Sequence, residues 1–131
     1  MARSKKTNPV NWFEIPVKDM KRAKRFYEKV FGLKLVLTEM KHEWGSVSMA
    51  WFPMTQGAMG ATGTLIKGPS YRPSRSGTVI YFTVKDIGAA LRKIKAGGGK
   101  MLMPKTAIGE YGSIAQFEDI EGNRLALHSM K

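Results

Sequence analysis

The residue types best suited to catalysis and metal binding are scarce in this sequence. The 131-residue chain has no cysteine and only two histidines, His42 and His128. A thiol nucleophile, a disulfide framework and a Cys-ligated zinc or iron–sulfur site are therefore excluded, and so is a His-rich metal site. His42 stands in the charged turn Lys41-His42-Glu43, where we expect an exposed side chain.

The charge balance points toward an anionic partner. The chain carries 22 Lys and Arg against 10 Asp and Glu, a formal net charge of +12. Such an excess is typical of proteins that meet nucleic acid, an acidic membrane or an anionic metabolite. The charge is spread over both halves of the chain, is densest in residues 18–34, and comes with no recognition motif for nucleic acid. We therefore expect a basic solvated exterior and keep nucleic acid binding as the lesser alternative.

Targeting and phosphate-binding motifs are also missing. Gly97-Gly98-Gly99 follows an expected helix, whereas a phosphate-binding loop precedes one. No segment reaches the roughly 18 apolar residues of a membrane span, and the basic start of the chain lacks the apolar region of a secretory signal. We expect a cytoplasmic protein whose residues 1–8 form a disordered basic lead.

Two pairs of matching segments indicate a duplication that would position any site. Val17-Lys18-Asp19-Met20 returns as Val84-Lys85-Asp86-Ile87, 67 positions later. Glu43-Trp44-Gly45-Ser46-Val47 returns as Glu110-Tyr111-Gly112-Ser113-Ile114 at the same offset. Two independent matches at one offset predict two similar modules.

The duplication predicts one domain, residues 9–131, with modules at 9–67 and 77–131 and a Gly-, Pro- and Ser-rich linker at 68–76. Each module reads as one strand, one helix and three more strands. The helices are expected between the N-cap residues Asp19 and Asp86 and the C-cap residues Gly32 and Gly97. The strands are expected at residues 10–17, 33–40, 46–52 and about 60–66, and again at 78–84, 100–103, 113–118 and 124–128.

A βαβββ module cannot cover both faces of its own sheet. A four-stranded sheet with one helix leaves half of its surface bare. Two such modules would place their helices on the outside and curve their sheets around a central hollow, which we call the cup. The expected fold class is therefore α+β, with two βαβββ modules forming a curved mixed-sheet cup.

This arrangement resembles the vicinal oxygen chelate superfamily, which contains glyoxalases, bleomycin-resistance proteins and extradiol dioxygenases. The resemblance covers about residues 8–130. It rests on the Asp-capped helix with Phe26-Tyr27 and Phe31-Gly32 and on the late turn 117–123, where Ile120 replaces the usual proline. Three stretches resemble the lactoylglutathione-lyase-related subgroup, namely residues 10–17, 103–110 and 121–129.

The resemblance implies a divalent cation in the cup, held by His or Glu from the first and last strands of each module. Carried over, three ligand positions fall on Trp12, Val79 and Ala126, and the fourth falls near Thr62–Thr64. Catalytic cations need three or more nitrogen or oxygen ligands, which these positions do not supply. We therefore predict no metal ligand and no cofactor, with loss of metal-dependent glyoxalase or dioxygenase activity.

Strand alternation predicts which side chains replace the metal. Residues at i and i+2 share a face, so Glu14, Tyr81 and His128 would lie in the cup one step beyond the vacated ligand positions. As catalytic residues, Glu14 would act as general base, His128 as proton shuttle and Tyr81 would orient the substrate. The structural alternatives are a Glu14 bonded to backbone or to Arg124, a Tyr81 packed in the core and a solvated His128.

Around these residues we expect a substrate-binding lining. Trp12 would form an apolar wall for a planar ligand, Arg124 would be the basic group best placed to meet an anionic one, and Glu110 would lie in a loop at the mouth. The predicted substrate-binding residues are Trp12, Val79, Arg124, Ala126, Met49, Trp51 and Gln116.

The resemblance and the site together favour the binding of a neutral or anionic small molecule, with metal-independent lyase- or isomerase-type catalysis as a further step. The alternative is a non-catalytic sequestering protein of the bleomycin-resistance type, and the lesser alternative is a metal-dependent glyoxalase or dioxygenase. The resemblance also implies a homodimer, and the lack of a long apolar segment predicts no membrane partner.

Overall fold

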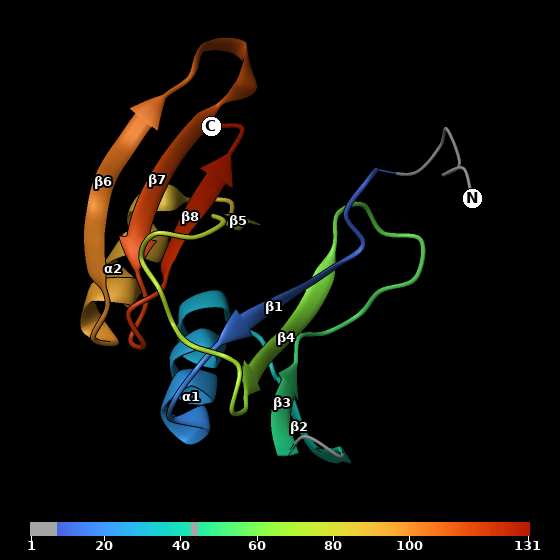
Figure 1. The fold of residues 1–131 in the computed structure, drawn as a ribbon. Coiled ribbons are helices and arrows are strands. Elements are labelled where there is room, and N and C mark those ends of the chain that lie inside the picture. Colours follow the sequence, from blue (N-terminus) through green and yellow to red (C-terminus); the bar gives the residue numbers. More distant parts are fainter. Residues whose placement is uncertain (1–7, 43–44) are drawn as a thin grey trace.

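The computed structural model describes residues 8–42 and 45–131 (Figure 1). The predicted lead, save Asn8, and the repeat residues Glu43-Trp44 lie outside the described residues. The first module contains β1 (Trp12–Pro16), α1 (Met20–Phe31), β2 (Val36–His42), β3 (Gly45–Trp51) and β4 (Thr62–Lys67). The second contains β5 (Tyr81–Thr83), α2 (Ile87–Ala96), β6 (Lys100–Ala107), the short 3-10 turn η1 (Gly109–Tyr111), β7 (Ser113–Glu118) and β8 (Arg124–Ser129).

The two modules have the same topology. One four-stranded sheet has the order β1-β4-β3-β2 and the other has the order β5-β8-β7-β6. In each sheet the first and last strands of the module pair in parallel, and the other pairs are antiparallel. This identical order confirms the α+β fold with two βαβββ modules that the sequence repeat predicted.

Aspartate side chains start both helices as expected. Asp19 Oδ1 accepts the N–H of Arg22 at 3.1 Å, and Asp86 Oδ1 accepts the N–H of Ala89 at 3.0 Å. These bonds satisfy N–H groups that have no partner within the first helical turn. Gly32 closes α1 in the left-handed region with φ 63°.

Three strands differ from their predicted bounds by three residues or more at one end. β5 is limited to residues 81–83. β2 begins only at Val36, because the N–H of Leu35 donates to the Glu28 carboxylate at 2.9 Å. That hydrogen bond, with a second from Lys24, lowers the pKa of Glu28. β6 continues past Pro104 to Ala107, with register shifts on both sides of Met103. Proline is tolerated there because β6 is an edge strand.

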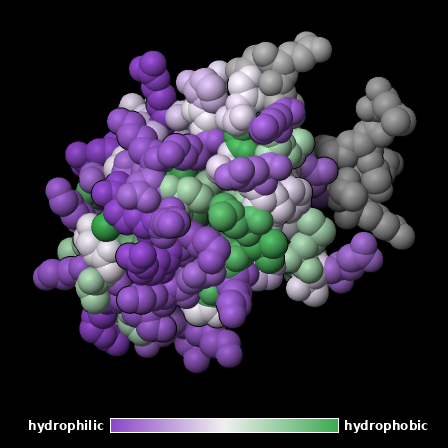
Figure 2. Space-filling model, turned by 90° about the horizontal axis from the view of Figure 1, so that it is seen from below, coloured by the Kyte–Doolittle hydropathy of each residue, from purple (hydrophilic) through white to green (hydrophobic). Residues whose placement is uncertain are grey.

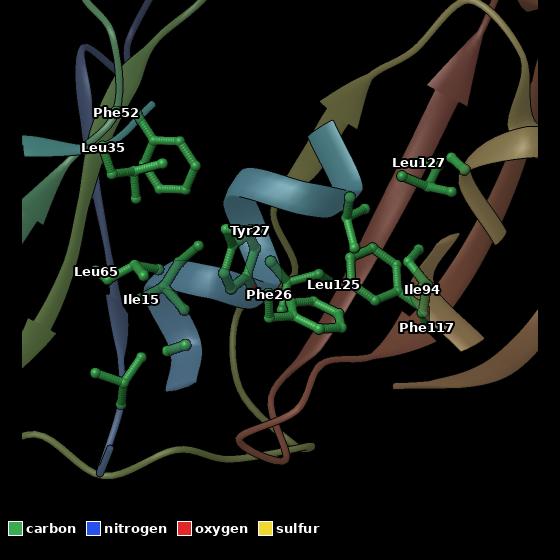
Figure 3. Close-up of a cluster of buried hydrophobic side chains, with 14 of the residues drawn as sticks. Ile15, Phe26, Tyr27, Leu35, Phe52, Leu65, Ile94, Phe117, Leu125 and Leu127 are labelled. Atoms are coloured by element: carbon green, nitrogen blue, oxygen red, sulfur yellow. The ribbon is translucent and has the colours of Figure 1, made fainter. Parts of the chain in front are cut away.

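The modules share one hydrophobic core on the helix side of both sheets. The prediction that both helices lie on the outside is therefore wrong, because α1 lies between the two sheets (Figure 3). In Figure 3, α1 passes between Ile15 and Leu65 of the first sheet and Phe117 and Leu125 of the second. At the junction, Phe82 of β5 packs against aromatic rings of the first module, with centroid distances of 4.4 to 6.0 Å. The modules are therefore joined by packing and not only by the linker.

The late turn between β7 and β8 fastens the second module to α1. Asp119 is buried and its carboxylate accepts the Tyr27 hydroxyl at 2.6 Å and the N–H groups of Glu121 and Asn123 at 2.8 Å each. Burial raises the pKa of Asp119, although these hydrogen bonds favour its ionised form. Burial, followed by the charge of Asp119, holds the pKa of Tyr27 well above its ordinary value of 10.0.

Glu121 in the same turn reaches the N-terminus of α1. Its carboxylate accepts the backbone N–H groups of Lys18 and Asp19 and lies 2.7 Å from the guanidinium of Arg22. The Glu121 side chain is 1% exposed. A buried carboxylate at a helix N-terminus is stabilised by the free N–H groups and by the helix dipole.

Most of the basic residues are solvated, as the charge pattern predicted. Along α1 and its flanks the exposed basic residues are Lys18, Lys21, Arg22, Arg25, Lys29 and Lys34. Seen from below, most of the surface is hydrophilic, with a hydrophobic patch near its centre (Figure 2). Neither helix in the described part of the chain is long and apolar enough to cross a lipid bilayer.

Candidate functional site

A hollow of about 730 Å³ lies where the edge strands of the two sheets face each other. One wall is β1, the opposite wall is residues 77–81, and the linker contributes Arg72 and Ser74. Most of its lining is apolar. The full lining is Val10, Trp12, Phe13, Glu14, Pro16, Ala61, Arg72, Ser74, Gly77, Thr78, Val79, Ile80, Tyr81 and Asn123.

The alternation predicted for β1 holds except at Phe13, which lines the hollow as well as packing against the core. Trp12, Glu14 and Pro16 line the hollow, whereas Ile15 and Val17 are buried in the shared core. The period of two therefore gives one strand both a site face and a core face.

The opposite wall follows the same rule less strictly, because Ile80, which was predicted to pack outward, also lines the hollow. Val79 and Tyr81 line the hollow, whereas Phe82 and Val84 pack against the core. The sequence repeat makes Tyr81 the equivalent of Glu14, so the two polar groups occupy matching positions on the two walls.

Glu14 and Tyr81 are both accessible from solvent. Tyr81 is 48% exposed, and Glu14 also falls in the exposed class. A carboxylate becomes an effective general base when burial or a neighbouring charge makes it more basic. The hollow leaves Glu14 open to solvent, so a bound molecule would have to cover it before it could act as a general base.

The hollow does not include His128. Its Nε2 atom lies 2.7 Å from the carbonyl oxygen of Tyr111. The register between β5 and β8 explains why His128 lies apart from Tyr81. Tyr81 pairs with Ala126, whereas His128 pairs with Thr83, two residues further along the strands. Of the three predicted catalytic residues, Glu14 and Tyr81 therefore line the hollow and His128 does not.

Arg72 is the arginine of the hollow, in place of the predicted Arg124. The Arg124 guanidinium donates to the carbonyl oxygen of Arg75 and to Oε1 of Gln116, at 3.0 Å each. Arg124 lines a smaller cavity of about 50 Å³ beside Glu14. Gln116 is thus a partner of Arg124, and Glu110 lies in the exposed turn η1.

Asn123 positions the walls of the hollow. Its Nδ2 donates to the carbonyl oxygen of Pro16 at 2.7 Å, and its Oδ1 accepts the N–H of Ser74 at 2.9 Å. One side chain therefore connects β1, the linker and the late turn. Sequence reasoning missed Asn123 and Arg72. Arg72 could have been proposed from the sequence, because a linker that joins the two modules has to pass the place where they come together.

Trp51 and Met49 lie behind the hollow and not at its surface. Trp51 meets Trp12 edge to face at a centroid distance of 5.2 Å, and its indole N–H donates to Oγ1 of Thr38 at 2.7 Å. Met49 is buried in a small cluster on this face of the sheet. Ala126 is fully buried as well. These predicted substrate-binding residues support Trp12 or the sheet and do not line the hollow.

The structure also fixes the fourth position of the implied metal site. Glu14 pairs with Thr64 just as Tyr81 pairs with Ala126, so Thr64 is the equivalent of Ala126. Its hydroxyl is buried and has no hydrogen-bond partner. The four positions would thus offer one hydroxyl, one indole and two aliphatic side chains.

That set does not fit a catalytic divalent cation, which takes carboxylate, imidazole or thiolate ligands. Across residues 8–42 and 45–131, no three His, Cys, Asp or Glu side chains gather in a way that could hold a metal ion.

Family comparison agrees with the fold. The family model described as Glyoxalase/Bleomycin resistance protein/Dioxygenase superfamily matches residues 10–127. The chain belongs to this superfamily. The resemblance inferred from the Asp-capped helix, the late turn and the duplication is thereby confirmed.

Two curated mycobacterial proteins also match the chain. CFP32 of Mycobacterium tuberculosis and of Mycobacterium bovis, whose name assigns it provisionally to the glyoxylases, is 30% identical over 118 residues. The match covers 89% of this chain and 44% of CFP32. The chain thus spans less than half of the length of these relatives.

Solved structures with the same fold include proteins of several kinds. A glyoxalase family protein from Bacillus cereus superposes with a TM-score of 0.74 at 18% identity and covers 98% of both chains. TnmS3, an antibiotic binding protein from Streptomyces sp. CB03234, superposes with a TM-score of 0.63 at 22% identity, covering 96% of this chain and 98% of TnmS3. At these identities the likeness shows the fold alone.

Proposed function

We propose that this protein binds a small planar organic molecule, neutral or anionic, in the hollow between its two modules. The observation that carries the proposal is a largely apolar hollow of about 730 Å³ with a few polar groups at its walls. Small-molecule sites have this character and typical volumes of about 300–1,000 Å³.

The walls define the class of ligand. Trp12 offers a large aromatic surface, and its edge-to-face contact with Trp51 fixes its orientation. Arg72 brings a guanidinium, which stacks on planar groups and pairs with carboxylate, sulfonate or phosphate oxygens. A net charge of +12 also disfavours a cationic ligand.

Binding without turnover is the function that the geometry supports best. Glu14 is exposed and His128 lies outside the hollow, so the hollow does not bring the predicted acid–base pair together. Holding a ligand without converting it requires only the residues that line the hollow. The fold likeness to the antibiotic binding protein TnmS3 is compatible with such a role.

A second candidate is metal-independent lyase- or isomerase-type catalysis, which the placement of Glu14 and Tyr81 on opposite walls favours. A planar ligand between them would displace water from Glu14 and make it a stronger base. Tyr81 would then donate its hydroxyl hydrogen to an oxygen of the ligand. Metal-dependent glyoxalase or dioxygenase chemistry is not proposed, because the donor set does not fit a cation.

The two candidates separate in one variant, Glu14→Gln. If the protein only binds, the affinity for a planar anion such as 1-naphthalenesulfonate should stay within about twofold, since Gln keeps the shape of Glu. If the protein is an enzyme, this variant should lose about 100-fold or more of its turnover of a substrate found by screening aromatic acids. Calorimetric titration and the screen measure the two effects. A Trp12→Ala variant that binds 1-naphthalenesulfonate as tightly as the original protein would contradict both candidates.

A further inference from the structure

A small polar recess lies beside Glu14, between β1 and the start of β8, with a volume of about 50 Å³. Six of the nine residues that line it also line the hollow, and they come from both walls of the hollow and from the linker. The shared residues are Glu14, Pro16, Ser74, Thr78, Ile80 and Asn123. The recess therefore lies between the same two walls as the hollow and forms a side pocket of it.

The size of the recess limits what it can hold. A volume of about 50 Å³ admits one or two groups of the size of a water molecule, which takes up about 30 Å³ in the liquid. The hollow, by comparison, has a volume of about 730 Å³. A planar ring system can therefore lie only in the hollow, whereas a single small substituent on that ring can enter the recess.

Two opposite charges border the recess and do not pair with each other. Glu14 and Arg124 both line it. Among the ion pairs formed within residues 8–42 and 45–131, none joins these two side chains. A carboxylate only accepts hydrogen bonds and a guanidinium only donates them. The recess therefore suits a substituent that donates on one side and accepts on the other.

The residues around the recess are held in place before any ligand binds. The Arg124 guanidinium donates to the carbonyl oxygen of Arg75 and to Oε1 of Gln116, and these two bonds use two of its five N–H groups. Asn123 is 5% exposed, and both ends of its amide connect β1 to the linker. A ligand group that enters the recess therefore has few side chains to order, and ordering is a main cost of binding.

We infer that the ligand is a hydroxylated planar molecule whose hydroxyl group enters this recess, donates to Glu14 and accepts from Arg124. A hydroxyl has the volume of a water molecule and does both. A carboxylate would meet the like charge of Glu14, an ammonium would meet that of Arg124, and a methyl group would leave both charges without a partner. This inference rests on the proposed function, because the recess can select a substituent only if the hollow holds the ring.

Probes that differ only in one substituent test the inference. The reference is 1-naphthalenesulfonate, and the test probes carry one added hydroxyl group, at each of the other ring positions in turn. The matched probes carry a methyl group at the same positions. Calorimetric titration measures each affinity, and the readout is its ratio to the affinity of 1-naphthalenesulfonate for the same protein.

At least one hydroxyl isomer should bind about tenfold more tightly than 1-naphthalenesulfonate, because its hydroxyl bonds to two charged groups. The methyl isomer with the same substitution should gain nothing. Arg124→Met removes the donor and should abolish the gain of the hydroxyl isomer. The matched control is Arg75→Met, which removes the same charge from a side chain that lines neither space and should keep the gain.

The same titrations keep the inference apart from the proposed function. If Trp12→Ala weakens 1-naphthalenesulfonate but no hydroxyl isomer binds more tightly than it, or the gain survives Arg124→Met, the proposed function stands and the hydroxyl recess is wrong. An equal gain from the methyl isomer overturns the inference as well. If none of the probes binds, or if none responds to Trp12→Ala, the proposed function fails and the inference falls with it.

Discussion

At the scale of single residues, the most demanding group in the molecule is the buried carboxylate of Asp119. It is 2% exposed and is surrounded by hydrogen-bond donors from Tyr27, Glu121 and Asn123. A buried charge is tolerated only when it is fully hydrogen-bonded. The sequence drew attention to the late turn as a family motif, but only the structure shows that its aspartate holds α1 of the other module.

Tyr27 makes this network sensitive to alkaline pH. Burial holds the pKa of its hydroxyl well above 10.0 in the folded protein. When the pH rises past 10, a tyrosine in the unfolded chain loses its proton whereas Tyr27 in the folded protein keeps it. The unfolded state then binds fewer protons, so the free energy of unfolding falls as the pH rises.

We therefore predict that Tyr27→Phe loses about 1–2 kcal/mol of stability at pH 7, where one hydrogen bond to Asp119 is removed. The difference between the variant and the original protein should shrink between pH 10 and pH 11, because Phe has no proton to lose. Urea unfolding at pH 7, 10 and 11 measures both. Parallel pH dependence of the two proteins would show that Tyr27 is not the group responsible.

Alternation along the strands revealed which residues face the site, but not how far along the sheet each one lies. Glu14, Tyr81 and His128 could all be assigned to the same face from the period of two. Their separation into different rows depends on the register between β5 and β8, which no local pattern encodes. Arg72 could not be found in this way because the linker has no periodicity.

At the scale of elements, the position of β1 against β4 determines the shape of the site. The two strands pair in parallel from Trp12–Thr62 to Pro16–Ile66. Gly63 lies within this ladder, and a Cβ atom there would collide with the carbonyl oxygen of Phe13. Only glycine allows so close an approach of backbone to backbone.

Gly63→Ala should therefore force β1 away from β4 and destabilise the protein by about 2–4 kcal/mol, as other overpacking substitutions do. The matched control is Gly77→Ala, because a Cβ atom on Gly77 would meet nothing within 4 Å. Urea denaturation compares the two variants. Equal stability in both would mean that the close contact between Gly63 and Phe13 is not rigid.

Element bounds were predictable where a local signal defines them. The helix caps Asp19 and Asp86 are examples, since their carboxylates act within one turn of the helix. The late start of β2 was not predictable, because it depends on Glu28 binding the backbone of Leu35. The continuation of β6 through Pro104 depends on its edge position, which is a property of the whole sheet.

At the scale of the whole molecule, the two modules of the duplication share one hydrophobic core. Phe82 of the second module stacks on Phe31 of the first at 4.4 Å and also meets Phe13, Tyr27 and Phe52. Asp119 and Glu121 add buried hydrogen bonds between the modules. Sequence repetition predicted the modules, whereas their common core is visible only in the packing.

Phe82→Ala should consequently destabilise both modules together, by about 3 kcal/mol. The three tryptophans, Trp12, Trp44 and Trp51, all belong to the first module in the sequence, so their fluorescence follows mainly the unfolding of that module. Far-UV circular dichroism reports both modules. In urea the two signals should follow one shared transition at lower denaturant than in the original protein. An unchanged fluorescence transition beside a shifted dichroism transition would show that the modules unfold independently.

The central claim is that the space between the modules holds a small planar molecule. A crystal structure of the protein with 1-naphthalenesulfonate tests it most directly. We predict electron density for the ring system against Trp12, between β1 and residues 77–81, with the sulfonate toward Arg72. Density confined to another surface, such as the basic groove of Arg92, Lys95 and Lys100 beside α2, would contradict the claim.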